Sequence, residues 1–576
     1  MLKEPMARTH VHLGGLHGTV EAALHEMALT RLVTRLWSKD HQLWKPEPTE
    51  IANRLGWLTV AEQLREKVGP LQAFVQAVRN AGFRDVVLLG MGGSSLGPEV
   101  FRCSFGSTRG FPHLWVLDST VPGLIRQVTK AINPSKTLFI LASKSGGTIE
   151  VMSLYAHFSG LVGKARKNQG GAPASTPGGA QFVAITDPGT SLGALAHERG
   201  FRTTFTNPPD IGGRYSVLSY FGLVPAALMG LDVSMLLNRG IEMAQACRPG
   251  IPPDQNPGAY LGAVMGILGR SGRDKVTIVA SPRINSFGLW AEQLLAESTG
   301  KEGKGLIPVA QEPLAPPEAY GNDRLFVYLR LEGDANAESD KHVKALERAG
   351  HPVVRLMLRD TYDLAGEFFR WEFATAIAGH YLGIHPFDQP NVQESKENTA
   401  RVLDYVKAHG KLPPSDAPES GVDTLLSQAG PGRYLAILAY LTPSAQSDAA
   451  IKALRKTLLT KHHLTTTAGY GPRYLHSTGQ LHKGGPNSGL FLQLIEEMKP
   501  DVAIPGQPYT FGTLAQAQAV GDYQSLQARH RAVVRVRVGS RPAQAIKKVL
   551  KPSRKRPSTG ARAVKKRGGK RGKRRR

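Results

Sequence analysis

Cysteine is scarce in this sequence. Among 576 residues only Cys103 and Cys247 occur, far apart in the chain. This scarcity argues against a disulfide framework and a cysteine-rich zinc site, and it favours a reducing cytoplasm. Long apolar runs are missing as well: no stretch approaches the ~18 apolar residues of a membrane span, and residues 1–15 lack the apolar core of a signal peptide. We therefore expect a cytoplasmic chain without a membrane segment.

Acidic residues are absent from residues 541–576, which contain 17 lysines and arginines. A segment of this composition cannot bury apolar surface, so we expect a disordered tail. The tail carries most of the net charge of +26, because the rest of the chain has 55 basic residues against 46 acidic ones. We expect it to bind polyanions without sequence preference and to be an appendage to the main function.

The sequence does contain two successive blocks in which short β-rich apolar runs alternate with helical segments. The runs span 86–89, 114–117, 138–141 and 182–185 in the first block, and 276–280, 325–329 and 353–357 in the second. Such alternation predicts α/β units whose parallel strands are joined by helices. Two units in tandem predict a cleft between them, because ligands of open parallel sheets bind beyond the carboxyl ends of the strands.

These patterns divide the chain into five parts. We expect an N-terminal helical segment at 1–66, a first αβα domain at 67–235, a second at 236–405, a smaller α+β unit at 406–540 and the tail at 541–576. In the smaller unit, 422–440 and 444–458 have helical character and 533–538 alternates as a strand. The Gly/Pro/Ser-rich stretch 170–180 predicts a flexible surface loop.

Two loops after predicted strands have the composition of anion sites. Residues 90–98, G-M-G-G-S-S-L-G-P, enter a helix, and their glycines let backbone N–H groups approach an anion. A structural turn explains this loop equally well, whereas a dinucleotide fingerprint does not, because Ser95 holds the place of the third glycine. Residues 143–148, S-K-S-G-G-T, also open a helix. Their three hydroxyls suit a phosphate better than an ordinary helix cap, which needs one.

A third segment places a carboxylate near the end of a helix. Phe287, Trp290 and Leu294 recur at i, i+3 and i+7, which predicts a helix with one buried face. Glu297 lies in its last turns, where it faces a ligand if the helix ends at the edge of a sheet. Taken alone, Glu297 is more simply a solvated carboxylate, because charged residues are mostly exposed.

Together, five motifs resemble those of glucose-6-phosphate isomerase (phosphoglucose isomerase). G-x-G-G-S-x-L-G-P, S-K-x-x-x-T, G-G-R-x-S, Q-x-x-x-E-S-x-G-K and F-D-Q-x-x-V-x-x-x-K occur in the family's order between Gly90 and Lys396. The likeness is greatest to the isomerase half of bifunctional transaldolase/glucose-6-phosphate isomerase proteins, and it extends over R-L-G-W-L at 54–58 and the third unit. A transaldolase barrel needs about 200 residues, and fewer than 90 precede Gly90, so we expect that activity to be absent.

The resemblance implies two sugar-isomerase (SIS, flavodoxin-like) domains and interconversion of glucose 6-phosphate and fructose 6-phosphate through a cis-enediolate. It makes Glu297 the base that moves the proton, Arg214 the cation that stabilises the enediolate and Lys396 a participant in ring opening. The other matched residues are implied to bind substrate: Ser143, Lys144, Ser145 and Thr148 hold the phosphate, Gly93 and Ser94 line the sugar site, and Gln293 and Gln389 orient hydroxyls. A homodimer is also implied, and no metal or organic cofactor is required.

The family's ring-opening histidine is out of place in this sequence. In the family it lies in a Q-H-S or L-H-S segment between the glutamate and the lysine, but here His380 and His385 lie in that interval without the motif. The motif L-H-S appears later, at 475–477. We hypothesise that His476 is supplied from the third unit or from a neighbouring subunit. A structural loop histidine is the alternative, and His482 is the local competitor.

Two other functions are consistent with such domains. SIS domains also occur in phosphosugar sensors, and the basic tail would then associate the sensor with nucleic acid. A sensor needs the phosphate loop but not Glu297, Arg214 and Lys396 together, so their joint presence favours the enzyme. The second alternative, an isomerase that also acts on mannose 6-phosphate, is not distinguished by the sequence.

Overall fold

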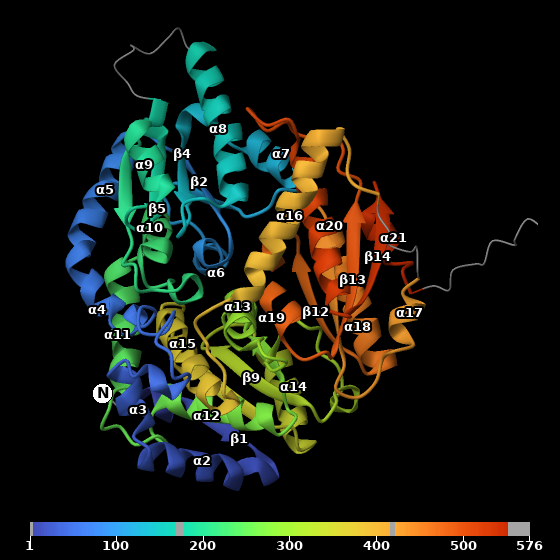
Figure 1. The fold of residues 1–576 in the computed structure, drawn as a ribbon. Coiled ribbons are helices and arrows are strands. Elements are labelled where there is room, and N and C mark those ends of the chain that lie inside the picture. The colour runs from blue at the N-terminus through green and yellow to red at the C-terminus, as the bar shows by residue number, and fades with distance from the viewer. Residues whose placement is uncertain (1–3, 169–177, 415–420, 551–576) are drawn as a thin grey trace, which may run out of the picture.

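The computed structural model describes residues 4–168, 178–414 and 421–550, and in this part of the chain the strands form three sheets (Figure 1). The sheets belong to three units, which we call the first, second and third unit in chain order. Helices cover the faces of each sheet, and all strands except one are parallel to their neighbours. The predicted α/β class is confirmed.

The first sheet has the strand order β3-β2-β4-β5-β6. Its strands are β2 (Asp85–Gly90), β3 (His113–Leu117), β4 (Thr137–Ala142), β5 (Phe182–Thr186) and β6 (Thr203–Thr206). The helices of this unit are α5 (Val68–Asn80), α6 (Leu96–Phe105), α7 (Pro122–Ala131), α8 (Ile149–Asn168), α9 (Ser191–Glu198) and α10 (Tyr220–Leu228). All four predicted strands of this sheet are present. Helices cover both faces of β2, β4 and β5, so these strands are almost continuously apolar, and such apolar runs are what the prediction relied on.

The second sheet has the order β1-β10-β9-β7-β8. Its strands are β1 (Thr9–His12), β7 (Lys275–Ala280), β8 (Ile307–Ala310), β9 (Arg324–Leu331) and β10 (Val353–Leu358). Its helices are α11 (Val233–Ala246), α12 (Pro257–Arg270), α13 (Phe287–Thr299), α14 (Ala337–Arg348) and α15 (Asp363–Leu382). β1 is the antiparallel strand and pairs with β10. The N-terminal segment, expected to be helical, therefore contributes a strand besides α1 (Glu4–Ala7), α2 (His17–Leu29), α3 (Leu32–Trp37) and α4 (Val60–Leu64).

The third sheet corrects two expectations. Its order is β12-β11-β13-β14 and all its strands are parallel, so this unit is α/β and not α+β. The predicted helix at 422–440 is wrong, because only the short α17 (Asp423–Leu426) is helical there and β11 (Tyr434–Tyr440) is a strand buried at every residue. The other elements are α16 (Pro390–His409), α18 (Ala445–His462), β12 (Thr465–Tyr470), α19 (Gly479–Gly484), β13 (Gly489–Glu496), α20 (Phe511–Ala528), β14 (Ala532–Gly539) and α21 (Pro542–Ile546).

The predicted tail begins later than expected. Residues 541–550 include α21, and Ile546 is buried in the core of the third unit. Residues 551–576 lie outside the described part of the chain, as does most of the loop predicted at 170–180. No helix among the described residues has the length and hydropathy to cross a membrane.

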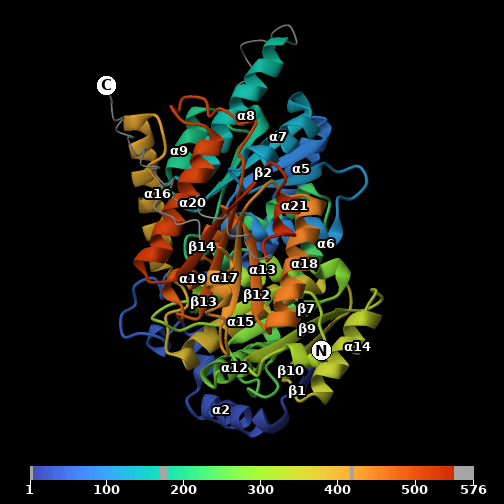
Figure 2. The ribbon, with the colours of Figure 1, turned by 90° about the vertical axis from the view of Figure 1, so that its right-hand side faces the viewer.

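Helix α20 joins the first and third units. Phe511, Leu514 and Ala517 pack in the core of the first unit, together with residues of α8 and α16, whereas Ala519 and Leu526 pack in the core of the third. Figure 1 shows α16 and α20 running side by side between the first unit and the third sheet, and Figure 2 shows the same pair from its edge. The two units therefore share a helix rather than meeting at a loose surface.

Candidate active site

Glu297 lies at the buried end of α13. Phe287, Trp290 and Leu294 face the core as predicted, and Glu297 itself is only 6% exposed. Burial raises the pKa of its carboxyl group, although the positive charge of Arg214 opposes the shift. The helix ends at Gly300, where a Cβ atom would lie 2.4 Å from the Cα of Leu481. Glycine is needed at this point because α19 passes so closely.

Arg214 is held against Glu297 by a full set of hydrogen bonds. Its Nη1 lies 3.3 Å from Glu297 Oε2 and also donates to Gln389 Oε1, while Nε donates to Ser298 Oγ at 2.8 Å. Its Nη2 donates to the carbonyls of Pro386 and Asp388. The guanidinium is 2% exposed and cannot turn without losing these contacts. Its positive charge is therefore fixed beside the Glu297 carboxylate.

The loop at 90–98 packs directly on the arginine segment. A Cβ atom at Gly93 would lie 2.0 Å from the carbonyl oxygen of Gly213, so only glycine permits this approach. Ser94 is next in this turn and is 8% exposed. The first and third motifs, separated by about 120 residues in sequence, thus form one wall of the site.

His476 comes from the third unit of the same chain. Its Nε2 lies 2.9 Å from Glu150 Oε1, and its backbone carbonyl accepts a hydrogen bond from Gln293 Nε2 at 2.9 Å. The Gln293 amide also lies 3.4 Å from Glu297 Oε2, so one side chain contacts both the base and the histidine segment. His476 is on the short helical turn Arg473–His476, and its side chain is 16% exposed.

Glu150 follows the phosphate loop within the first turn of α8. Burial raises its pKa, but the charge and hydrogen bond of His476 outweigh burial, and the net pKa is lowered. Lys396 is exposed on α16, and its positive charge contributes to this lowering. The buried Glu150 is therefore a carboxylate that faces His476, with Lys396 nearby.

The serine-rich loop brings two of its three hydroxyls together at the start of α8. Ser143 Oγ accepts from the N–H of Gly146 at 3.1 Å and lies 2.9 Å from Thr148 Oγ1. Ser145 is exposed at the tip of the loop. Lys144 turns away, because its amine donates to Asp187 and to the carbonyl of Pro209. The hydroxyls of Ser143 and Thr148 thus lie together, whereas the Lys144 side chain is engaged elsewhere.

The side chains of the other candidate histidines have other partners. His482 is 2% exposed between the rings of Tyr474 and Phe491, and burial lowers its pKa well below the usual range. His380 Nδ1 lies 2.7 Å from the carbonyl of Leu43, and His385 Nε2 lies 3.2 Å from that of Thr49. Of the three, none contacts Glu150 or Glu297 through a hydrogen bond in the described chain.

Two charged residues of the cluster are absent from the predicted set. Glu150 gives little signal, because an acidic residue in the first turn of a helix is common on electrostatic grounds alone. Lys301 stands in the motif Q-x-x-x-E-S-x-G-K, but a lysine after a helix is normally solvated. In the structure it is buried and donates to Asp388 and to the carbonyl of His385. Burial and the neighbouring Arg214 lower its pKa to about 7.

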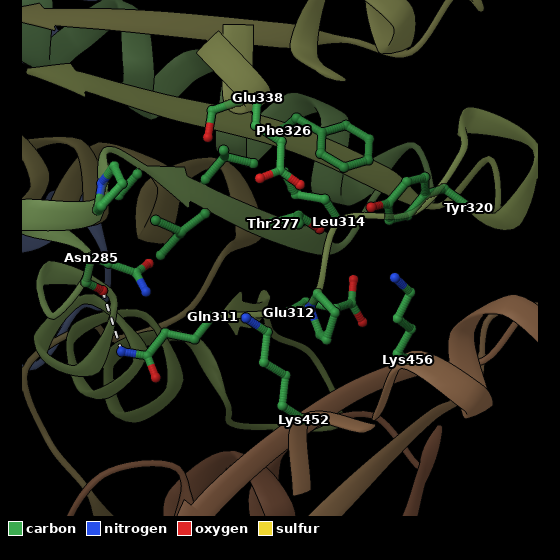
Figure 3. A pocket seen from close by; sticks show the side chains of 16 residues that line it. Thr277, Asn285, Gln311, Glu312, Leu314, Tyr320, Phe326, Glu338, Lys452 and Lys456 are labelled. Carbon is green, nitrogen blue, oxygen red and sulfur yellow. Dashed lines mark hydrogen bonds between the residues drawn. The ribbon is translucent and has the colours of Figure 1, made fainter. Parts of the chain in front are cut away.

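A separate cavity lies away from these residues. It measures about 370 Å³ and is bounded by β7, the segment after β8 and α18. Figure 3 shows Lys452 and Lys456 pointing from α18 toward Glu338, with Tyr320 at one end. None of the predicted site residues lines it. In the described part of the chain, no group of three or more His, Cys, Asp or Glu side chains is arranged to hold a metal ion.

Comparisons with known proteins agree on one family. A family model described as phosphoglucose isomerase matches residues 60–305. The glucose-6-phosphate isomerase of Citrifermentans bemidjiense is 30% identical over 394 residues, which are 60% of this chain and 72% of that protein. The enzyme of that name from Rubrobacter xylanophilus is 29% identical over 381 residues, 58% of this chain and 86% of the relative. The crystal structure of a glucose-6-phosphate isomerase from Chlamydia trachomatis shares the fold, with a TM-score of 0.50 and 20% identity over 65% of this chain and 78% of that one.

Proposed function

The chain belongs to the phosphoglucose isomerase family, and we propose that the residues gathered around Glu297 interconvert glucose 6-phosphate and fructose 6-phosphate. The observation that carries this assignment of residues is the convergence of three units on one place. Glu297 and Arg214 come together at 3.3 Å, and His476 and Glu150 at 2.9 Å, with Gln293 in contact with both groups.

The isomerisation step moves a proton between two neighbouring carbons. Glu297 takes the proton from the carbon next to the carbonyl and returns it one carbon away, with a cis-enediolate between the two steps. Its raised pKa makes it a stronger base than a solvated glutamate. Arg214 already lies beside the carboxylate in a buried place, where it stabilises the negative charge that develops on the enediolate oxygens.

The phosphate group of the substrate anchors it at the start of α8. The hydroxyls of Ser143, Ser145 and Thr148 and the helix N-terminus donate to its oxygens. The Lys144 amine, bound to Asp187, supports the loop rather than the ligand. Glu150 is in the first turn of this helix, so binding of the phosphate brings the sugar to His476.

Ring opening precedes proton transfer when the substrate is cyclic. In glucose 6-phosphate the bond between C1 and the ring oxygen breaks, the ring oxygen receives a proton from His476, and the C1 hydroxyl loses its proton as C1 becomes a carbonyl, with Lys396 as the second acid–base residue. The Glu150 carboxylate lies against Nε2 and holds the imidazole in place. No step requires a metal or an organic cofactor.

A coupled assay of fructose 6-phosphate conversion tests this function. The wild-type chain turns the sugar over, and Glu297→Gln loses about 10²- to 10⁴-fold in kcat, the usual contribution of a general base. The variant still binds the substrate, because the phosphate loop is untouched. Binding by the wild type without turnover would instead make the chain a phosphosugar sensor.

Three further properties are proposed on the family resemblance and composition. We propose a homodimer in the cytoplasm and non-specific binding of polyanions by residues 541–576, of which 551–576 lie outside the described chain. The site described above is drawn from one chain, so the dimer is not needed to supply His476. Activity on mannose 6-phosphate is tested by replacing the substrate in the same assay.

A further inference from the structure

Three buried side chains form a continuous line of hydrogen bonds that ends at the partly buried His476. Thr120 Oγ1 donates to Gln518 Oε1 at 2.7 Å, and Gln518 Nε2 donates to Glu150 Oε1 at 2.7 Å. The same carboxylate oxygen lies 2.9 Å from His476 Nε2. Thr120, Gln518 and Glu150 are each at most 3% exposed. The line therefore crosses from the first unit through α20 to the His476 segment without contact with solvent.

The Glu150 carboxylate fixes which way the Gln518 amide points. An ionised carboxylate only accepts hydrogen bonds, so the amide nitrogen faces Glu150, and the amide oxygen accepts from the Thr120 hydroxyl. The opposite orientation would place two acceptor oxygens against each other in a buried place, where no water replaces the lost hydrogen bond. Gln518 consequently presents a fixed N–H donor to the carboxylate.

The helix that carries Gln518 is itself held on both sides. Ala517 packs in the core of the first unit and Ala519 in that of the third, so Gln518 lies at the junction of two cores. Its Cα position is therefore determined by packing, and the amide adds the final orientation. A side chain held in this way has little conformational freedom, so it can orient the side chain to which it donates a hydrogen bond.

We propose that Gln518 is a positioning residue for ring opening, which holds the Glu150 carboxylate in place so that His476 presents Nδ1 to the sugar ring. The proposal rests on the function proposed above. Glu150 Oε1 accepts from both Gln518 and His476, and the amide hydrogen bond favours the charged form of the carboxylate. A charged Glu150 then keeps the imidazole in one orientation.

Gln518→Leu removes the donor at nearly constant volume and tests the proposal in the full-length chain. We expect kcat on cyclic fructose 6-phosphate to fall about tenfold, as for the loss of one charge-assisted hydrogen bond. The acidic limb of the kcat/KM profile should move to higher pH, because the less stabilised carboxylate is protonated more easily. Proton exchange at C1 of 5-deoxyfructose 6-phosphate, which lacks the hydroxyl that closes the furanose ring, should change less than twofold when followed by NMR in D2O.

Gln518→Glu gives an outcome that a purely structural role would not produce. A protonated glutamic acid donates to Glu150, whereas an ionised one repels it. The variant should therefore approach wild-type activity at acidic pH and lose activity as pH rises, opposite to Gln518→Leu. An unchanged pH profile in both variants would overturn the proposal.

Gln493→Leu is the matched control. Gln493 is also fully buried beside α20. Its amide donates to the carbonyl of Ala519 and accepts from Arg535 Nε, so it too has one charged partner, but it does not contact Glu150. We expect a loss of thermal stability similar to that of Gln518→Leu without a shift of the pH profile. An equal shift in both leucine variants would assign the effect to packing alone. If wild-type protein does not convert fructose 6-phosphate, the proposed function fails, and that result is distinct from any outcome of the variants.

Discussion

Arg473 and Asp118 form a two-pronged ion pair between the third and the first unit. The guanidinium donates from Nε at 2.7 Å and from Nη2 at 2.9 Å, and Asp118 is fully buried at the carboxyl end of β3. His476 follows Arg473 by three positions, so this contact fixes the short helical turn that carries the histidine. Ser95 of the glycine-rich loop donates to the same carboxylate.

Asp118→Asn should therefore weaken both the fold and the ring-opening step. We expect unfolding to become easier by about 3 kcal/mol, because breaking one partner of a buried ion pair leaves the other charge uncompensated. Urea denaturation measures the change. The exposed pair Lys407–Asp404 provides the comparison, and Asp404→Asn should cost less than about 0.5 kcal/mol. Equal effects of the two substitutions would contradict the role given to Asp118.

His476→Ala should separate the two halves of the reaction. Turnover of the cyclic sugar should fall about 10²-fold, the lower end of general acid–base contributions. Proton exchange on the open-chain analogue should persist, since Glu297 and Arg214 are unchanged. Unchanged turnover of the cyclic sugar would remove His476 from the mechanism, and His482→Ala serves as the control because that ring is buried in the core of the third unit.

A substitution in the phosphate loop should weaken binding of the substrate. Thr148→Val should raise KM for fructose 6-phosphate about tenfold with little change in kcat, because a hydroxyl donor to the phosphate is lost in ground and transition states alike. Inhibition by inorganic phosphate should weaken by a similar factor. Ser427→Ala, on an exposed residue of the third unit, should change neither constant. A loss confined to kcat would place Thr148 elsewhere in the mechanism.

Lys301 predicts a pH dependence with a definite sign. Its pKa is about 7 in the folded chain, whereas the ordinary value is 10.5, so between these values the unfolded chain binds a proton that the folded chain lacks. The free energy of unfolding of the wild type should therefore rise with pH above 7, relative to Lys301→Met, by up to about 1.4 kcal/mol per pH unit. Urea midpoints on both sides of pH 7 measure this difference. The exposed neighbour Lys304 provides the control: the difference in free energy of unfolding between the wild type and Lys304→Met should not change with pH.

Two truncations test the position of the tail boundary. Removal of residues 551–576 should leave kcat and KM unchanged and abolish salt-sensitive binding to heparin. Removal of residues 541–576 also deletes α21, and the loss of buried Ile546 should cost about 1.5–3 kcal/mol of stability. Equal stability of the two truncated chains would show that α21 contributes nothing.

Much of the fold could be read from apolar runs, and the exceptions have physical reasons. β11 is buried on both faces, so its residues Tyr434–Tyr440 lack the alternation that distinguishes a strand from a buried helix. β1 is only half-buried and pairs with β10, whose residues are more than 300 positions away, and no local pattern specifies such a partner. Strands could be predicted where they lie in the middle of a sheet and are bounded by turn residues in the sequence.

The site divides along the same line. Glu297, Arg214 and the serine loop carry local motifs, and the structure places Glu297 and Arg214 in contact. Glu150 and Gln518 carry none, because their roles arise from contacts with a histidine and a threonine in distant segments. A local sequence motif reflects contacts between residues that are close in the chain. Glu150 and Gln518 instead contact residues that are distant in sequence and become neighbours only in the folded protein.

The sharing of α20 between two cores bears on how the chain is made. Phe511, Leu514 and Ala517 complete the core that begins with β2, so a ribosome must synthesise more than 400 residues between the first and last members of that core. Until then the first unit exposes an apolar groove, and neither His476 nor Gln518 has joined Glu150. A nascent chain released before α20 would thus be inactive and prone to aggregate, and catalytic competence is acquired at the end of folding.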